Sequence, residues 1–267
     1  IGDRWSAGAA TIADEHTATA TLQRLIGRLG PSFNRPGRKR GTIVVGAAPG
    51  DPHGVGTALL LETIRDRNLP VRKVVVASSQ AVYNEGAYRC AEDGPFYGTT
   101  RAIQQLARGV WAMRCPRCGQ PATPIPTDEA APTGGENVYA ISKMIQERLV
   151  LSWGRATGIP AVALRYSCTY GPRQSLFNPY TGVIAIFCTR LVNDLAPIVY
   201  EDGGQMRDLI YVEDVARANL LVANDPRADG QVFNVGTGQA AEIGRLAGIL
   251  AAKLGKPIAP EIPGEFR

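Results

Sequence analysis

The stretch Val74-Val-Val-Ala-Ser-Ser79, with Tyr139-Ala-Ile-Ser-Lys143 sixty residues after it, decides the fold class of this chain. The first stretch is a run of apolar β-branched residues, which predicts a buried strand that ends in two serines. Tyr139 and Lys143 are four residues apart and share one face of a helix. A phenol is a poor base at neutral pH, and a nearby ammonium favours its ionised form. Ser79, Tyr139 and Lys143 are therefore the predicted catalytic residues of an enzyme that moves a proton and a hydride.

Strand and helix patterns alternate around these two stretches. Short apolar runs predict strands at 42–45, 73–77, 161–165, 197–200 and 231–235. Helical periodicity and capping residues predict helices at 11–29, 57–67, 137–157, 182–193, 212–223 and 242–254. This rhythm predicts an α/β fold with a Rossmann-like, mainly parallel sheet and a smaller substrate-binding region. Residues 84–136 interrupt this alternation as a long irregular insertion. Such an insertion is expected to have a function of its own or a cross-link that stabilises it.

Composition excludes several classes of protein. The chain has 267 residues, of which 45% are hydrophobic, enough to bury a real core. The sequence contains no run of eighteen or more apolar residues, so it predicts no membrane span. The N-terminus lacks the pattern of a signal peptide. The net charge of +5 does not favour nucleic-acid binding, because the densest basic run, residues 35–40, is rich in Pro and Gly and has no aromatic residues. We expect a cytoplasmic protein.

Five cysteines, an odd number, favour a reducing compartment over a disulfide framework. Cys115-Pro-Arg-Cys118 has the spacing of a zinc knuckle, and Cys90 lies in the same insertion. Zinc takes four ligands, and Asp93 is the available fourth, because both histidines lie elsewhere in the chain. A structural zinc ion and free or mutually oxidised thiols are both open interpretations. Cys168 and Cys188 are expected in the core.

Five motifs resemble those of the extended short-chain dehydrogenases/reductases, in order and in spacing. They cover residues 73–267 and are Val-Val-Val-Ala-Ser-Ser-Gln-Ala-Val-Tyr83, Tyr-Ala-Ile-Ser-Lys143, Leu-Arg-Tyr-Ser-Cys-Thr-Tyr-Gly-Pro-Arg173, Gln-Met-Arg-Asp-Leu-Ile-Tyr-Val-Glu-Asp214 and Phe-Asn-Val-Gly-Thr-Gly238. This part of the chain is similar to the NAD-dependent sugar-nucleotide epimerase/dehydratase family.

The resemblance implies a role for each matching residue. Ser79 orients a sugar hydroxyl, Tyr139 takes its proton, and Lys143 tunes Tyr139 and holds the nicotinamide ribose of NAD or NADP. The implied chemistry is transient oxidation of a nucleotide sugar to a keto-sugar. The helix of Tyr139 is also the expected contact of a homodimer.

Two further positions receive roles by the same resemblance. The turn from Tyr166 to Cys168 would lie beside the nicotinamide. Arg207 would bind the diphosphate of the substrate, a task that suits a guanidinium group. The alternative for Arg207 is a surface ion pair with Asp208 or Glu213.

The N-terminal part departs from this family, which begins with a strand, a Gly-x-x-Gly-x-x-Gly turn and a helix that binds pyrophosphate. Residues 46–56 are rich in glycine but have a different spacing. Only about sixteen residues separate them from the strand of Ser79, where the family has several more strands. Half of the cofactor domain is therefore expected to be missing, and the C-terminus is expected to stop short of the family's full substrate domain.

Residues 1–70 resemble part of a cobalamin-binding domain instead. Asp51-Pro-His53-Gly-Val-Gly56 has an Asp-x-His-x-x-Gly pattern, and Trp5 and Glu15-His16 precede it. Neutral imidazole is a good cobalt ligand, and a carboxylate can hydrogen-bond its other nitrogen. The resemblance implies that His53 ligates cobalt with Asp51 behind it, that Trp5 covers the corrin, and that Glu15 and His16 approach the metal from above. A packed tryptophan, a solvated Glu-His pair and a histidine in a turn are the alternatives.

We therefore expect a fusion of two partial modules. Its parts are a helical segment and linker (residues 1–40), a strand-loop-helix unit (41–72), and an epimerase/dehydratase portion (73–267). The leading hypothesis is an NAD(P)-dependent epimerase or dehydratase. The alternative is a cobalamin-binding sensory or regulatory fragment whose epimerase portion is catalytically idle.

Overall fold

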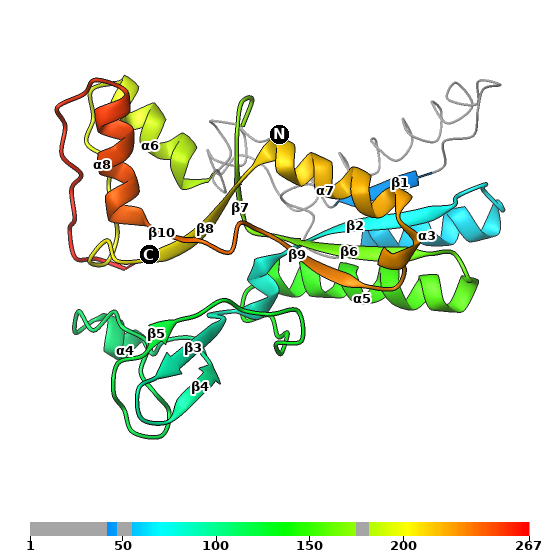
Figure 1. Ribbon diagram of the computed structural model, residues 1–267, viewed down its shortest axis with the longest axis horizontal. Coiled ribbons are helices and arrows are strands. Elements are labelled where there is room, and N and C mark those ends of the chain that lie inside the picture. Colours follow the sequence, from blue (N-terminus) through cyan, green and yellow to red (C-terminus); the bar gives the residue numbers. More distant parts are fainter. Residues whose placement is uncertain (1–41, 47–54, 175–181, 267) are drawn as a thin grey trace, which may run out of the picture. The chain divides into compact units, whose positions relative to one another are not determined.

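A parallel sheet of four strands organises the computed structural model, which describes residues 42–46, 55–174 and 182–266. The strands are β1 (Thr42–Gly46), β2 (Lys73–Ser79), β6 (Ala161–Tyr166) and β9 (Val232–Val235), in the order β1-β2-β6-β9 (Figure 1). All neighbouring strands run parallel. Parallel strands need crossover connections, which here include the helices α3 (Val55–Asp66), α5 (Val138–Thr157) and α7 (Val212–Asn224). The described residues belong to one unit of the chain, residues 41–176 with 182–267.

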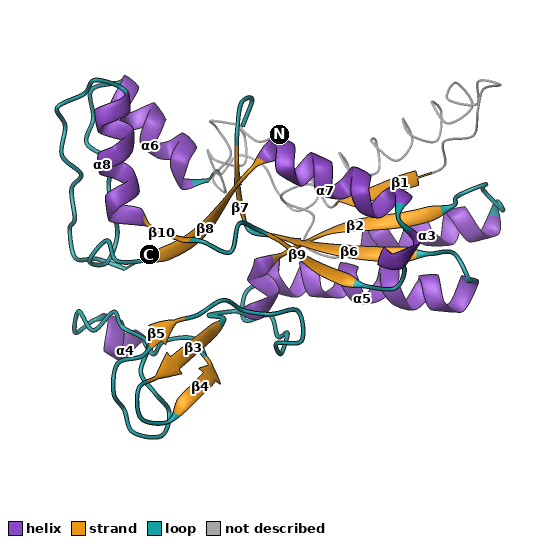
Figure 2. Ribbon diagram, viewed as in Figure 1, coloured by secondary structure: helices purple, strands orange, loops and turns teal. Residues whose placement is uncertain are grey.

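Helices cover both faces of this sheet, which gives three layers (Figure 2). Val75, Val162 and Leu164 pack on one face against α7. Val74 and Val76 pack on the opposite face, against α3 and α5. Because successive side chains of a strand point to opposite faces, a sheet buried on both sides needs a continuous apolar run. The valines that precede Ser78 satisfy this requirement.

Helix α5 has well-defined ends and lies close to β6. Asn137 caps its N-terminus by accepting a hydrogen bond from the Ala140 amide at 2.9 Å, and Gly158 ends it in the left-handed conformation (φ 72°). A Cβ atom at Gly154 would lie 2.6 Å from the Cβ of Ala161, so only glycine permits this approach. The helix that presents Tyr139 and Lys143 is therefore held firmly against the sheet.

A second region follows β6 in the chain. Its three-stranded sheet has the order β10-β8-β7, formed by β7 (Cys168–Tyr170), β8 (Met206–Tyr211) and β10 (Ala240–Glu242). Helices α6 (Val183–Val192) and α8 (Ile243–Lys253) pack together through Phe187, Val199, Ile243 and Ala247.

The insertion, residues 84–136, has a small sheet of its own. Strands β3 (Ala87–Cys90), β4 (Gly94–Tyr97) and β5 (Thr123–Pro124) pair antiparallel in the order β4-β3-β5, and α4 (Ile103–Leu106) is a single turn of helix. Two short 3-10 helices, η2 (Gln80–Tyr83) and η3 (Pro226–Ala228), complete the described elements. The insertion, expected to be irregular, is thus mostly loop but contains this small sheet and one turn of helix.

The expected α/β fold with a parallel sheet is confirmed, as are the helices near 57–67, 137–157, 182–193, 212–223 and 242–254. The predicted strand at 197–200 is wrong, because only Ile198 forms an isolated bridge, with Glu261. Strands β7, β8 and β10 were not predicted. The helix expected at 11–29 lies outside the described residues.

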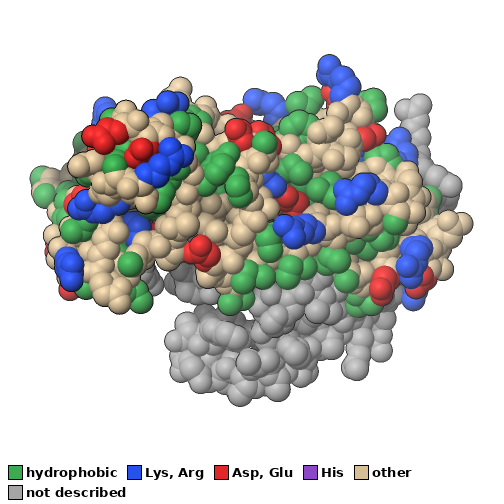
Figure 3. Space-filling view, turned by 90° about the horizontal axis from the view of Figure 1, so that it is seen from below, with side chains coloured by type: hydrophobic (Ala, Val, Ile, Leu, Met, Phe, Trp, Pro, Cys, Tyr) green, Lys and Arg blue, Asp and Glu red, His purple; other side chains and the backbone are tan. Residues whose placement is uncertain are grey.

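The helices and the distribution of surface charge bear on possible binding partners. Within the described part of the chain, none of the helices is both long and apolar enough to cross a membrane. On the face shown in Figure 3, Lys and Arg side chains are spread among Asp and Glu side chains.

Candidate functional site

The carboxyl end of β2 and the first turns of α5 bring together the residues predicted to be catalytic. Ser79 is the last residue of β2 and is buried. Lys143 is also buried, and its Nζ donates a hydrogen bond at 3.0 Å to the carbonyl of Ala77 on the same strand. The same Nζ lies 5.8 Å from the centre of the Tyr139 ring, whereas Tyr139 itself is 43% exposed. The arrangement presents a phenol to solvent above a buried ammonium.

Local hydrogen bonds fix these side chains. The Ser79 hydroxyl accepts a hydrogen bond from the Ala81 amide at 3.2 Å and so caps η2. The Ser142 hydroxyl donates to the carbonyl of Tyr139 at 2.8 Å within α5.

The positions predicted to lie beside a nicotinamide are at the same edge of the sheet. Tyr166 is directly opposite Ser79 in the β2–β6 register, and its hydroxyl is hydrogen-bonded to the side chain of Asn219. The thiol of Cys168 accepts a hydrogen bond from Gln80 at 3.2 Å. Open α/β sheets bind ligands at the carboxyl ends of their strands, and this edge is that end.

Burial shapes the chemistry of these two groups. It raises the pKa of the Tyr166 hydroxyl, against a smaller opposing effect of the hydrogen bond with Asn219. Burial also raises the pKa of the Cys168 thiol, and the nearby charge of Arg207 opposes that shift. Cys168 and Cys188 are both only half-buried, so the expectation that they are core residues is wrong.

A buried ion pair behind the site was not predicted from the sequence. Glu147 on α5 binds Arg165 on β6 through two hydrogen bonds of 2.5 and 3.0 Å, and it accepts another from Ser78 at 2.8 Å. Arg165 also donates to the hydroxyl of Tyr83 at 2.6 Å, and that hydroxyl donates to Asn234 at 2.7 Å.

The network ties α5 to three strands of the sheet, β2, β6 and β9. Its sequence signal is Glu147, one helical turn after Lys143 on the same face of α5. Burial raises the pKa of the Tyr83 hydroxyl, and the hydrogen bond from Arg165 opposes this. The network therefore keeps a charged pair inside the protein directly behind Ser79.

Arg207 is exposed on β8, and its Nη1 donates to the carbonyl of Met206 at 2.8 Å. Within the described residues it takes part in none of the ion pairs, so the alternative pairing with Asp208 or Glu213 is not formed. Asp208 instead accepts hydrogen bonds from the amides of Thr237 and Gly238, both at 2.9 Å. The Arg207 side chain is exposed, and its charge acts on the Cys168 thiol.

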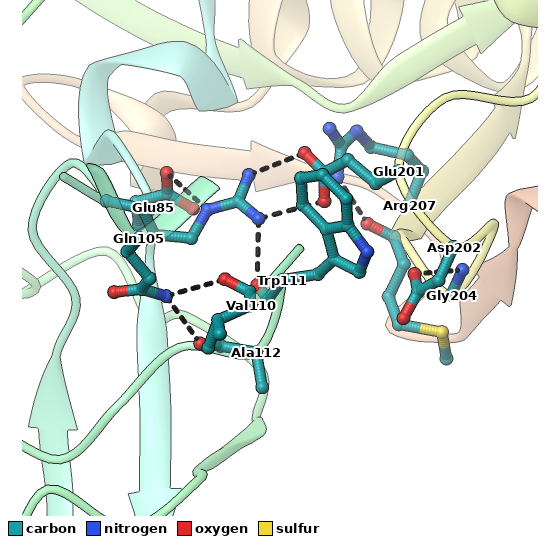
Figure 4. Close-up of polar contacts among 11 residues, drawn as sticks. Glu85, Gln105, Val110, Trp111, Ala112, Glu201, Asp202, Gly204 and Arg207 are labelled. Atoms are coloured by element: carbon teal, nitrogen blue, oxygen red, sulfur yellow. Dashed lines mark hydrogen bonds and ion pairs between the residues drawn. The ribbon is translucent and has the colours of Figure 1, made fainter. Parts of the chain in front are cut away.

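The insertion is attached to the segment that precedes Arg207. Arg101 binds both carboxylate oxygens of Glu201 at 2.9 Å and donates to the carbonyl of Trp111 at 2.8 Å. Glu85 lies 3.6 Å from the Nε of Arg101. Figure 4 shows these contacts between the insertion and Glu201. The ion pair with Glu201 is the main cause of a raised pKa of Arg101.

The insertion also contains a cluster of three cysteines and one aspartate. The ligand atoms of Cys90, Asp93, Cys115 and Cys118 all lie within 4.8 Å of one another. Hydrogen bonds from Cys118 and then Cys115 lower the pKa of Asp93, and the same contact with Asp93 raises the pKa of Cys118 to about 12. The structure thus brings together all four predicted zinc ligands.

The residues expected to bind cobalamin cannot be placed. Trp5, Glu15, His16, Asp51 and His53 all lie outside the described residues. Cobalamin binding therefore stays a prediction.

The fold and the site together define a class of protein. A Rossmann-like sheet with Ser79, Tyr139 and Lys143 at the carboxyl end of β2 is the arrangement expected of a short-chain dehydrogenase/reductase. Residues 116–236 match the family model described as the NAD dependent epimerase/dehydratase family. The sequence matches and the shared fold support placing the chain in that family.

Curated relatives agree with this placement. The dTDP-L-rhamnose 4-epimerase of Burkholderia thailandensis is 37% identical over 215 residues, which are 80% of this chain and 57% of that protein. The chain spans about half the length of the curated relatives it matches.

Solved structures show the same fold. A UDP-N-acetylglucosamine 4-epimerase from Methanobrevibacter ruminantium, in complex with UDP-N-acetylmuramic acid, superposes with a TM-score of 0.61 at 27% identity, covering 85% of this chain and 64% of that one. The UDP-glucose 4-epimerase of Thermus thermophilus, in complex with NAD, superposes with a TM-score of 0.54 at 29% identity, covering 78% of this chain and 58% of that one.

Proposed function

We propose that this chain is the catalytic portion of an NAD(P)-dependent epimerase or dehydratase that acts on a nucleotide sugar. The observation that carries the proposal is the position of Lys143, whose Nζ is 3.0 Å from the Ala77 carbonyl and 5.8 Å from the Tyr139 ring. The names of the relatives, which act on dTDP- and UDP-sugars, support the substrate class.

Tyr139 would act as the base and Ser79 as the residue that orients the sugar hydroxyl. Tyr139 would accept the proton of the sugar hydroxyl as the carbon loses its hydride, with the buried ammonium of Lys143 5.8 Å from the centre of its ring. When bound, the nicotinamide supplies the hydride acceptor and later the hydride donor. Tyr139 returns its proton, and the transient keto-sugar is reduced again or undergoes elimination.

The nicotinamide end of the cofactor fits the described site. Lys143 would hold its ribose, and Tyr166 and Cys168 lie at the edge where the ring belongs in this family. The loop that would hold the pyrophosphate includes residues 47–54, which lie outside the described residues.

Arg207 is proposed to bind the diphosphate of the substrate. Its side chain is exposed. The carboxylate of the neighbouring Asp208 accepts hydrogen bonds from backbone amides of the turn that follows β9. A guanidinium matches phosphate oxygens with two parallel hydrogen bonds, which suits this task.

A homodimer through α5 is also proposed. Val138, Ile141 and Ile145 are exposed on this helix at spacings of three and four residues, so they form one apolar stripe. Light scattering should give twice the monomer mass, and Ile145→Glu should give the monomer. A monomer for the unchanged chain rejects the dimer without touching the enzymatic proposal.

The proposed function is tested by two measurements on the full chain. Calorimetry should show binding of NAD or NADP, and NMR should show conversion of a UDP- or dTDP-sugar that Tyr139→Phe abolishes while cofactor binding persists. Failure of the unchanged chain to bind either cofactor and to convert any of these sugars would reject the proposal.

The cobalamin alternative has its own test. The absorbance spectrum of added cobalamin should change if His53 ligates cobalt and should stay that of the free cofactor if it does not. The His53→Ala variant serves as the matched control.

A further inference from the structure

The cysteine cluster has the dimensions of a tetrahedral metal site. The sulfur atoms of Cys90 and Cys118 are 3.4 Å apart, and one carboxylate oxygen of Asp93 lies 3.1 Å from Cys115 and 3.9 Å from Cys90. Bond lengths of about 2.3 Å to sulfur and about 2.0 Å to oxygen place the ligands of a tetrahedral site with three sulfurs and one oxygen roughly 3.5–3.8 Å apart. These three distances lie near that range, and all the ligand atoms of the four side chains are within 4.8 Å of one another.

Two similar turns supply the four ligands. Cys90 ends β3 and Asp93 lies in the tight turn to β4, so this pair is spaced Cys-x-x-Asp. Cys115 and Cys118 form the facing Cys-x-x-Cys turn, which is closed by the Cys115 amide bonded to the Gln120 carbonyl at 2.8 Å. Two facing turns with this spacing are the framework of zinc ribbons, with an aspartate here in one of the four positions.

Backbone and charge around the cluster also suit thiolate ligands. The amide of Arg117 points at the sulfur of Cys115, at 3.5 Å. Three thiolates and a carboxylate carry four negative charges, of which a divalent cation neutralises two. Arg117 donates to the Asp93 carbonyl at 3.3 Å, and Arg114 donates to the Gly119 carbonyl at 2.9 Å, so two cationic side chains lie beside the cluster.

The insertion contributes little to the hydrophobic core. Ala131, near its end, belongs to a core cluster with Val82 and Tyr83, but none of the described core clusters includes a residue between 84 and 130. The buried apolar residues in that range are Ala87, Cys90, Met113 and Cys115, and two of these are the cysteines themselves. Segments of fewer than about 70 residues rarely have enough core of their own and usually add a disulfide, a metal or a partner.

We propose that Cys90, Asp93, Cys115 and Cys118 bind one structural Zn²⁺ ion that holds the insertion in its folded form. All four positions are filled by protein ligands, which leaves none for a substrate or a reactive water, so the ion is structural rather than catalytic. Through Arg101, the insertion that this ion stabilises holds Glu201 in the segment leading to Arg207.

Metal analysis of the full chain, purified under reducing conditions, tests the site. Mass spectrometry of the metals should find about one zinc per chain. Replacement of zinc by Co²⁺ should give the visible bands of tetrahedral cobalt and the near-ultraviolet band of cobalt bound to thiolate. Neither readout depends on enzymatic activity.

Variants separate this site from incidental zinc binding. Cys118→Ser, which changes the ligand nearest the surface, should lose at least about nine-tenths of the zinc, whereas Cys188→Ser on α6 should keep all of it. Asp93→Cys should complete a four-thiolate site and retain zinc even if Cys118→Ser folds poorly.

Three results would overturn the proposal. They are a chain without zinc whose three thiols react freely in the native state, a mass two units lower that reports a bond between Cys90 and Cys118, and iron in place of zinc.

Discussion

Arg101 of the insertion forms a bidentate ion pair with Glu201, which lies in the segment before β8. Both N–O distances are 2.9 Å. Glu201 is buried, and its amide also donates to the Glu265 carbonyl at 2.7 Å. Glu201 precedes Arg207 by a few residues in the chain. The pair thus ties the insertion to the segment that leads to the proposed diphosphate-binding residue.

Arg101→Ala should therefore weaken substrate binding more than catalysis. We expect KM for the nucleotide sugar to rise about tenfold with a smaller change in kcat, because Arg207 loses its fixed support. Loss of a largely buried ion pair should also cost about 2 kcal/mol in the free energy of urea unfolding. Arg101→Lys keeps the charge but cannot form both hydrogen bonds, so its KM and its stability should lie between those of Arg101→Ala and the unchanged protein. Arg108→Ala, on the exposed surface of the insertion, is the control, and equal kinetics for both alanine variants would contradict the prediction.

The Glu147–Arg165 pair should be important for stability. Glu147→Gln leaves the buried Arg165 charge without its partner, so we expect a loss of about 3 kcal/mol in urea unfolding. The double variant Glu147→Leu with Arg165→Met should recover most of this loss, because it leaves no buried charge. Asp214→Asn breaks an exposed ion pair with Arg217 and should cost less than about 0.5 kcal/mol. An equal loss of unfolding free energy in Glu147→Gln and Asp214→Asn would contradict the prediction, because burial of the Glu147–Arg165 pair would then make no difference to stability.

Ser79 should have two separable roles. Ser79→Ala removes the hydroxyl that caps η2, which should cost about 1 kcal/mol, and it should lower kcat for the proposed reaction. Ser79→Thr keeps a hydroxyl and should restore the stability. Unfolding curves and steady-state kinetics of the two variants measure the roles independently. Unchanged kcat in a folded Ser79→Ala protein would remove Ser79 from the proposed catalytic set.

Asp225 should make stability depend on pH in the acid range. Its hydrogen bonds with Arg227 lower its pKa to about 2, below the value of about 3.9 for an unfolded chain. A lowered pKa in the folded state adds stability that is present above pH ~4 and is lost as the pH falls toward ~2. Asp225→Asn can still cap η3 but carries no charge, so its deficit in urea midpoint at pH 7 should shrink through this window. A deficit that is constant from pH 7 to pH 2 would contradict the assignment.

Strands β2 and β6 could be predicted because each is an apolar run that is buried along almost its whole length. Strand β8 has no such run, since most of Met206–Tyr211 is exposed or half-buried, and its pairing with β7 and β10 depends on residues far away in the chain. Residues 197–200 have the opposite property. Val199 is buried between α6 and α8, but its amide bonds to Glu261 rather than to a strand, so hydrophobicity alone gave the wrong prediction.

The sequence by itself determined the α/β class, the helix that carries Tyr139 and Lys143, and the strand that ends at Ser79. These features follow from local periodicity and from the spacing of residues within one element. Only the tertiary structure decided the pairings of Arg101 with Glu201 and Glu147 with Arg165, and the meeting of Cys90 and Asp93 with Cys115 and Cys118. Each of these joins charged or thiol groups from separate segments, and the partner that satisfies a buried polar group is chosen by the fold rather than by neighbouring residues.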